Sequence, residues 1–241
     1  ATPGETERDF LAKHGSVVVK PARGEQGRGI SVDLRDERAM EHAITAARQH
    51  CDRVLIERYC PGEDLRIVVI GGEVVAAAIR RPAEIVGNGR DSIERLIEAQ
   101  SRRRAAATGG ESRIPVDEET LRCICLAGHD MADVLAEGER LRVRKTANLH
   151  TGGTLHDVTG ELGAPLAEAA LKAAEVLDMP VVGLDLLVAD HRAGDHVIIE
   201  ANERPGLANH EPQPTAERFI DLLFPQTRRE AARNPARPQT S

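Results

Sequence analysis

Two apolar runs joined by a short polar turn constrain the fold of this chain most. The first run is GLDLLVA at 183–189, the second is VIIEANERPG at 197–206, and DHRAGD at 190–195 lies between them. Apolar runs on both sides of a polar turn predict two antiparallel strands. The first strand carries Asp185 inside its apolar run, and a carboxylate there is costly to bury unless a positive group meets it.

The polar side chains of this hairpin suggest a metal site. Glu200 and Asn202 are two residues apart, so a strand directs both side chains to one face. Together with Asp185 they offer two carboxylates and an amide without His or Cys, a set that suits Mg²⁺ held with substrate phosphates. The alternative is that Asp185 pairs with a nearby arginine and Glu200 lies on a solvated edge. The hairpin alone leaves both interpretations open.

The composition indicates a globular protein with an aliphatic core. Of the 241 residues, 41% are hydrophobic but only 2% are aromatic, so Val, Ile, Leu and Ala must fill the core. A net charge of -7 argues against nucleic-acid partners and against a basic membrane-binding surface. No stretch approaches the roughly 18 apolar residues of a membrane span.

The four cysteines indicate the cellular compartment, and the first residues indicate whether the chain is part of a longer protein. The cysteines show no metal or redox spacing, which predicts free thiols and a cytoplasmic location. The chain opens with ATPG rather than Met. We therefore expect it to be part of a longer multidomain protein, one that can assemble as a homo-oligomer.

A strand that ends in a lysine leads into a glycine-rich loop near the N-terminus. The strand is SVVVKP at 16–21, followed by RGEQGRG at 23–29 and a further strand at 30–32. Glycines in such a loop let backbone amides approach an anion. The loop lacks the Gly-Lys-Ser/Thr of a P-loop and the following helix of a dinucleotide fingerprint. A flexible hairpin is the alternative, and the preceding Lys20 favours a phosphate site.

The segment CPGED at 60–64 predicts a lobe boundary. We divide the chain into a small lobe over 1–62, a large lobe over 63–224 and a disordered tail over 225–241. Beyond the boundary, 65–70 and 73–79 are expected to form a hairpin across a Gly-Gly turn. Arg66 shares a strand face with Val68 and Ile70, which leaves it either an exposed edge residue or a buried anion ligand.

A second loop, KTANLHTGGT at 145–154, follows the expected strand at 141–144. Its two basic groups, amide, hydroxyls and glycine pair are typical of an anion-holding loop, and a plain glycine-rich turn is the alternative. Helices are expected around these features. They cover 5–14, 36–50, 91–104, a longer one capped by Asp117 and reaching Leu135, 166–177 and 215–224.

The order of these pieces resembles the ATP-grasp carboxylate–amine ligases from about Ser16 to Phe224. The segment VVKP with the glycine-rich loop looks like the family's nucleotide lysine and phosphate-covering loop, and IERYCPGED at 56–64 looks like its inter-lobe hinge. The resemblance implies an α+β fold of two lobes, each with a mainly antiparallel sheet and helices, with ATP between them. The nucleotide-binding residues that it implies are Lys20, Gly24, Gln26, Gly27, Gly29, Glu57, Tyr59 and Asp64.

The resemblance also implies a reaction. ATP would phosphorylate a carboxylate, and an amine would attack the acyl phosphate to form an amide. Asp185, Glu200 and Asn202 fall on the family's magnesium ligands, with two ions expected and Mn²⁺ able to substitute. We assign the charge on the reacting phosphoryl and acyl oxygens to Arg66, Arg144 and Asn148. Arg80 and Arg81 are alternatives that would bind a substrate carboxylate.

Two segments narrow the resemblance within the superfamily. TANLHTGGT at 146–154 and NERPGLANH at 202–210 resemble cyanophycin synthetases and the related glutathione-forming fusion enzymes, and KPARGEQGRGIS at 20–31 is similar to N-acetylglutaminylglutamine synthetases. The implied substrates are amino acids or acylated amino acids. A nucleotide-binding module without ligase activity, and phosphate transfer to another acceptor, remain as alternatives. The family clamps ATP between two lysines, and the earlier one is not found here, so we expect this chain alone to bind ADP·Mg²⁺ weakly without ligating.

Overall fold

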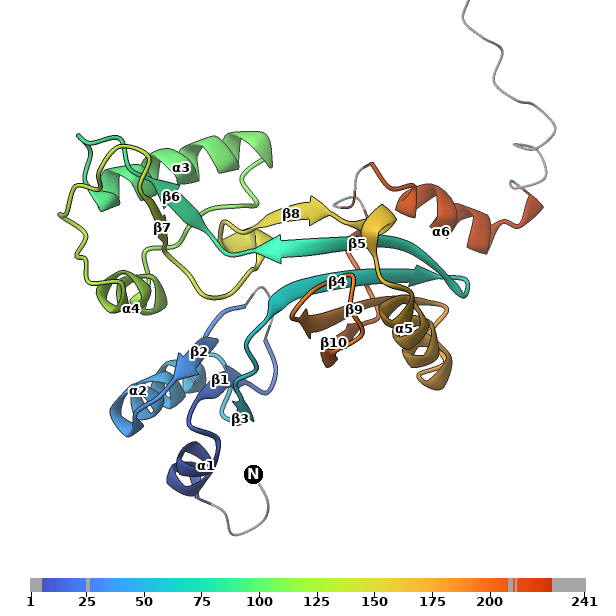
Figure 1. Ribbon diagram of the computed structural model, residues 1–241, viewed down its shortest axis with the longest axis horizontal. Coiled ribbons are helices and arrows are strands. Elements are labelled where there is room, and N and C mark those ends of the chain that lie inside the picture. The colour runs from blue at the N-terminus through green and yellow to red at the C-terminus, as the bar shows by residue number, and fades with distance from the viewer. Residues whose placement is uncertain (1–5, 25–26, 208–209, 211, 227–241) are drawn as a thin grey trace, which may run out of the picture. The chain divides into compact units, whose positions relative to one another are not determined.

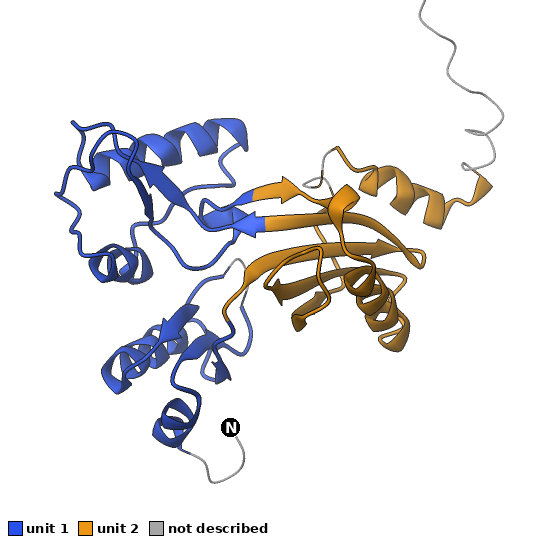
Figure 2. Ribbon diagram, in the orientation of Figure 1, with its two compact units in different colours: residues 1–60, 80–154 blue, residues 61–79, 155–241 orange. Residues whose placement is uncertain are grey.

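The computed structural model describes residues 6–24, 27–207, 210 and 212–226 (Figure 1). The chain divides into two compact units (Figure 2), unit 1 with residues 1–60 and 80–154 and unit 2 with residues 61–79 and 155–241. These units group 80–154 with the N-terminal segment, whereas the sequence placed 80–154 in the large lobe. The division at residue 62 stays a prediction about the two lobes. The expected tail lies almost entirely outside the described residues.

The N-terminal part of unit 1 is a three-stranded antiparallel sheet covered by helices on one face. The strands are β1 (Val17–Pro21), β2 (Ser31–Leu34) and β3 (Val54–Arg58), in the order β2-β1-β3. The helices are α1 (Glu7–His14) and α2 (Glu37–Arg48). Alternate residues of β1 are buried because they pack on the helices, as a period of two requires. Their cluster contains Leu11, Val17, Val19, Leu34, Met40, Ala43 and Ala47.

The second part of unit 1 packs two helices against a short β-ribbon. The ribbon pairs β6 (Glu84–Val86) with β7 (Arg140–Arg142), and the helices are α3 (Ile93–Ala107) and α4 (Glu118–Leu126). A short 3₁₀ turn, η1 (Leu149–Thr151), lies in the 145–154 loop. The core cluster here is almost entirely branched aliphatic, with Ile85, Ile93, Ile97, Ile124, Leu135, Leu141 and Val143 among its members.

The helix expected from Asp117 to Leu135 is much shorter than predicted. Asp117 does cap α4, with its side chain accepting from the Thr120 amide. The helix ends at Leu126, however, because Gly128 adopts a left-handed φ of 83° two residues later. Leu135 is still buried, but it reaches the core from the following loop rather than from a helical stripe.

Most of unit 2 is a five-stranded sheet in the order β10-β9-β4-β5-β8. The strands are β4 (Glu63–Ile70), β5 (Glu73–Arg81), β8 (Thr154–Asp157), β9 (Val181–Val188) and β10 (His196–Asn202). β4 and β5 form the expected hairpin, whose Gly71 and Gly72 adopt φ values of 60° and 79°. Positive φ at both turn positions belongs to a type I′ turn and explains the glycine pair. The hairpin of β9 and β10 is likewise antiparallel, as predicted.

The two faces of this sheet are covered differently. One face packs on α5 (Ala164–Val176) through a cluster that includes Leu65, Ile67, Leu166, Ala170, Leu184 and Leu186. The other face packs on α6 (Thr215–Leu223) only near Val68 and Ile70, through Phe219 and Leu222. A short 3₁₀ turn, η2 (Thr159–Glu161), precedes α5. Each buried Leu or Ile contributes about 1.5–3 kcal/mol, so the α5 face anchors the sheet.

Candidate functional site

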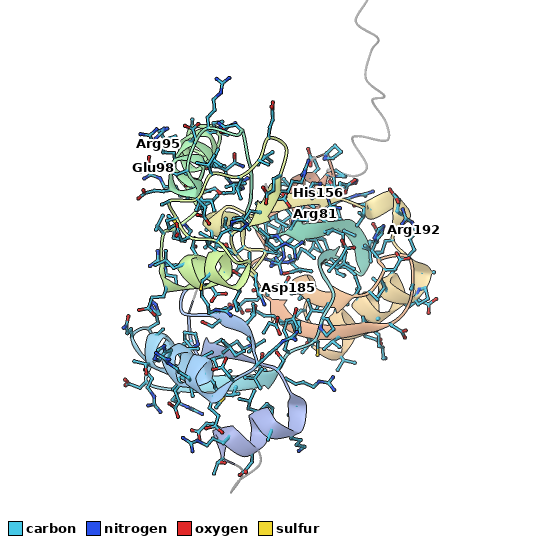
Figure 3. All side chains as sticks on the ribbon, turned by 60° about the vertical axis from the view of Figure 1, so that its left-hand side comes forward. Arg81, Arg95, Glu98, His156, Asp185 and Arg192 are labelled. Carbon is cyan, nitrogen blue, oxygen red and sulfur yellow. The ribbon has the colours of Figure 1, made fainter. Side chains whose placement is uncertain are left out.

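The strand register brings the predicted metal ligands together on one face of the unit 2 sheet. Asp185 lies directly opposite Arg66 of β4 on one side and opposite Glu200 of β10 on the other, and Asn202 lies opposite Gly183. Directly opposed residues in an antiparallel ladder direct their side chains to the same face. This is the face on which α6 packs near Val68 and Ile70. Asp185 is labelled in Figure 3.

Asp185 is bound to Arg66 by a bidentate ion pair. Arg66 donates from Nε to Oδ1 in a very short contact and from Nη2 to Oδ2 at 3.1 Å. The side chains are 15% and 9% exposed. The guanidinium lies over Gly183, where a Cβ would come within 2.9 Å of Nη1. The alternative interpretation of Asp185, pairing with an arginine, therefore describes this structure. Arg66 is half-buried and its partner here is the Asp185 carboxylate, while its role as an anion ligand stays a prediction.

Glu200 and Asn202 reach the site from the outermost strand. β10 has a bulge between Ile198 and Glu200, and Glu200 is exposed. Asn202 donates from Nδ2 to the Gly183 carbonyl at 3.4 Å. Among the described residues, no three or more His, Cys, Asp or Glu side chains gather closely enough to hold a metal. The predicted set therefore depends on its amide as third ligand, and its oxygen-only chemistry fits Mg²⁺. The metal assignment stays a prediction.

Two predicted nucleotide-binding residues meet on the open face of the first sheet. Lys20 Nζ lies 2.8 Å from Glu57 Oε2, and their strands β1 and β3 are neighbours. Because Val17 and Val19 face the helices, Lys20 points to the opposite side. Leu55, the register partner of Lys20, is 42% exposed on that same side. The result is a face that combines an apolar surface with a charged pair.

Backbone geometry separates the three glycines of the first loop. Gly27 and Gly29 adopt left-handed φ values of 72° and 70°, and a Cβ on Gly29 would lie 2.5 Å from the His50 ring. Gly24 meets nothing closer than 3.7 Å. The position of a Cβ on Gly27 would be 3.5 Å from Asn148 Nδ2, so the two predicted anion-holding loops are neighbours within unit 1. Gln26, also predicted to bind nucleotide, lies outside the described residues.

The remaining nucleotide residues lie at the ends of strands. Tyr59 follows β3, where its amide donates to the Ser16 carbonyl at 3.0 Å. Asp64 lies on β4 opposite Leu187 in unit 2. Their roles toward adenine and ribose stay predictions.

Arg144 is more deeply buried than a group that contacts substrate needs to be. Its side chain is 3% exposed, and Nη1 donates to Asp117 Oδ1 at 2.7 Å and to Thr120 Oγ1 at 2.9 Å. Its Nε is buried without a hydrogen-bond partner among the described residues. Arg144 thus ties the strand end to the first turn of α4, a placement that favours a supporting role. Its assignment to the reacting oxygens stays a prediction.

Asn148 organises the second loop. Its Oδ1 accepts from the His150 amide at 2.8 Å, and its carbonyl accepts from the Gly153 amide at 2.9 Å. The side chain therefore caps the 3₁₀ turn η1, while its Nδ2 group lies beside the glycine-rich loop. Its assignment to substrate oxygens also stays a prediction.

The sequence did not predict an ion-pair cluster that forms around Asp33. Asp33 adopts a left-handed φ of 56° and accepts from Ser16 Oγ at 2.8 Å, Arg35 Nε at 2.8 Å and Lys145 Nζ at 2.5 Å. Burial by itself raises the pKa of Asp33, but the bonds from Lys145, Arg35 and Ser16 outweigh it and lower the pKa to about 2. The cluster ties strand β2, which follows the glycine-rich loop, to the start of the 145–154 loop. In the sequence, the only indication of this cluster is the residue type of Asp33, because Asp tolerates a left-handed backbone better than most residues.

No helix in the described part of the chain has the length and apolar character needed to cross a bilayer. The longest, α3, has 15 residues and a charged surface that includes Arg95 and Glu98.

Comparisons with known proteins show what this chain is similar to. The model of the prokaryotic glutathione synthetase ATP-grasp domain matches residues 3–100. A cyanophycin synthetase of Trichormus variabilis is 35% identical over 222 residues, which cover 87% of this chain and 25% of that protein. The glutathione biosynthesis bifunctional protein GshAB of Clostridium perfringens is 28% identical over 236 residues, covering 91% of this chain and 30% of that protein. The chain thus spans about a quarter of the length of the first of these relatives.

Solved structures agree on the fold. A bifunctional glutathione synthetase from Pasteurella multocida superposes with a TM-score of 0.57 at 23% identity, over 92% of this chain and 33% of that one. A D-alanine–D-alanine ligase from Bacillus anthracis gives 0.54 at 16% identity, over 96% and 61%. The expected α+β fold with antiparallel sheets is confirmed. The family model over residues 3–100, the sequence relatives and the fold thus agree that this chain is similar to ATP-grasp ligases.

Proposed function

We propose that this chain is the ATP-grasp part of a ligase that joins a carboxylate to an amine through an acyl phosphate. The observation that carries the proposal is the convergence of Asp185, Glu200, Asn202 and Arg66 on one sheet face. Oxygen ligands for a divalent cation beside an arginine suit the transfer of a phosphoryl group, which needs positioning and charge neutralisation more than covalent help.

The first sheet supplies the nucleotide site. Lys20 binds the α- and β-phosphates, and the amides of Gly24, Gly27 and Gly29 approach the same phosphates. The Lys20–Glu57 pair supports this role, because it holds a cation on the open face beside an apolar surface. Glu57 and the backbone at Tyr59 bind adenine, and Asp64 binds the ribose hydroxyls.

The second sheet supplies the metal site. Asp185, Glu200 and Asn202 would hold Mg²⁺, as two ions or with Mn²⁺ as a substitute, and the metal would supply positive charge against the phosphates. Arg66 and Asn148 stabilise the negative charge that develops on the reacting oxygens.

The reaction has two balanced steps. A carboxylate oxygen attacks the γ-phosphorus, the bond to the β-phosphate oxygen breaks, and ADP leaves. The amine nitrogen then attacks the acyl carbon, the carbon–oxygen bond to the phosphate breaks, and the nitrogen loses its proton. The released phosphate therefore retains one oxygen of the original carboxylate.

The relatives and the first loop support a class of substrate. Relatives named cyanophycin synthetase and GshAB support an amino acid or a peptide-like acid as substrate. The sequence of residues 20–31 favours synthesis of an N-acetylglutaminylglutamine-type product. The Arg66–Asp185 and Lys20–Glu57 pairs also favour a second candidate, a nucleotide-binding module without ligation, because Asp185 and Lys20 each already have an ionic partner.

An ADP-release screen across acid and amine pairs tests the proposal on the full-length protein. Ligation predicts ADP release that requires both an acid and an amine, and that is lost in Glu200→Gln while the fold survives. Release that requires only one acceptor would indicate phosphate transfer instead. Nucleotide binding without any release would favour the binding module.

A further inference from the structure

We propose that Arg66 is a built-in counter-ion of Asp185, which competes with Mg²⁺ for this carboxylate and keeps metal affinity low when no nucleotide is bound. The inference rests on the metal site of the proposed function. It adds to the role of Arg66 on the reacting oxygens a second effect, which is exerted through Asp185.

The ion pair uses both oxygens of the carboxylate. Nε and Nη2 of Arg66 bind Oδ1 and Oδ2 of Asp185, and the two residues are fixed directly opposite each other on β4 and β9. Both side chains are largely buried, so solvent screens the pair weakly. A cation that binds Asp185 must therefore share oxygens that the guanidinium already holds.

The sheet is shaped to keep the guanidinium in this place. Gly183 leaves open the space that its Cβ would occupy, 2.9 Å from Arg66 Nη1 and 2.8 Å from the Pro205 Cβ. Any larger residue at 183 would push the arginine away from Asp185. The need for space beside Arg66, and not turn geometry, thus explains why a glycine stands at position 183 of the GLD sequence.

The Arg66–Asp185 pair changes the net charge of the predicted metal site and therefore its affinity for a cation. Asp185 and Glu200 lie opposite each other on neighbouring strands, where like charges destabilise. Arg66, Asp185 and Glu200 together carry a net charge of about -1, whereas the two carboxylates without the arginine carry about -2. Mg²⁺ binds more tightly to the more negative site. Arg66 consequently lowers the affinity of the site for free Mg²⁺. When the metal binds together with a nucleotide, the negative phosphates attract it as well, and this added attraction overcomes the competition from Arg66.

Mn²⁺ and Mg²⁺ alone, without nucleotide or substrate, test the inference on the 241-residue chain. Free Mn²⁺ is measured by electron paramagnetic resonance, and the melting temperature is measured with and without Mg²⁺. In Arg66→Met, which keeps the length of the side chain without its charge, we expect Mn²⁺ to bind at least tenfold more tightly than in the wild type, equivalent to about 1.4 kcal/mol. Mg²⁺ should also recover most of the melting temperature that this variant loses.

Two controls separate the site from general effects. Arg144→Met removes another buried arginine that is paired with a carboxylate, so it should lose stability without recovery by Mg²⁺. Arg66→Met combined with Glu200→Gln should lose the gain in Mn²⁺ affinity. If Arg66→Met folds only with Mg²⁺, the inference is supported. If it does not fold at all, Arg66→Lys replaces it, and its weaker, single-point contact should still give a severalfold gain.

Unchanged or weaker Mn²⁺ affinity in the Arg66 variant that folds would overturn the inference, because Arg66 would then not compete with the cation for Asp185. A gain that persists with Glu200→Gln would also overturn it, because the cation would then bind elsewhere. Neither result affects the ADP-release screen, so failure here is distinguishable from failure of the proposed function.

Discussion

Replacing Lys145 with Met tests whether the Asp33 cluster holds the 145–154 loop against the first sheet. Lys145 Nζ lies 2.5 Å from Asp33 Oδ2, with side chains 29% and 12% exposed. A partly buried, charge-assisted hydrogen bond of this kind contributes about 1–2 kcal/mol to the free energy of unfolding. Because the two residues are 112 positions apart, its loss also frees the loop.

Arg35→Met is the matched control. Arg35 donates to the other oxygen of the same Asp33 carboxylate at 2.8 Å, but it is 72% exposed and only two residues away. Its loss removes the same charge without releasing the loop, so the expected cost stays below about 1 kcal/mol.

The effect of Lys145→Met should depend on pH with a definite sign. The folded-state pKa of Asp33 is about 2, below its ordinary value of 3.8. Stability from a lowered carboxyl pKa is present above the unfolded value and is lost as pH falls through the folded value. Lys145→Met raises the pKa of Asp33, so its destabilisation should be full near neutral pH and shrink as pH falls from 4 toward 2.

Urea denaturation of wild type and both variants across this range measures the effect. Equal and small losses for Lys145→Met and Arg35→Met would refute the role of Lys145 as a tether. A gap between wild type and Lys145→Met that does not change with pH would refute the contribution of the Asp33 charge.

Two further predictions concern the first loop. Lys20→Ala should weaken ADP binding by about 1.5–3 kcal/mol, the size of a hydrogen bond to a charged group, and unchanged affinity in calorimetry would mean that Lys20 is only a surface residue at a strand end. Gly29→Ala should lower the free energy of unfolding by about 1–3 kcal/mol because its φ is 70° and His50 blocks the Cβ, whereas Gly24→Ala should change it by less than about 0.5 kcal/mol. Equal losses in thermal unfolding would contradict that distinction.

Local patterns explain the parts of the fold that were predictable. The β9–β10 hairpin and the β4–β5 hairpin each follow from apolar runs around a turn, and Asp117 was identified as a helix cap from its residue type. The helix beyond Asp117 was predicted too long because the apolar pattern continues past Gly128. In the structure, the left-handed backbone at Gly128 ends the helix.

The candidate site was less predictable because its key contacts join distant segments. Arg66 and Asp185 are 119 residues apart, and only the register of β4 against β9 decides that they meet. The burial of Arg144 was missed for the same reason, since a basic residue at a strand end usually reaches solvent. Here α4 presents Asp117 and Thr120 to its guanidinium, which no local pattern reveals.

The fate of one oxygen atom tests the central claim most directly. The full-length protein is supplied with ATP, an amine and an acid whose carboxylate carries ¹⁸O, and the released phosphate is analysed by mass spectrometry. An acyl-phosphate route predicts that one labelled oxygen passes from the carboxylate to each phosphate released with amide. Amide formed with unlabelled phosphate would contradict the account.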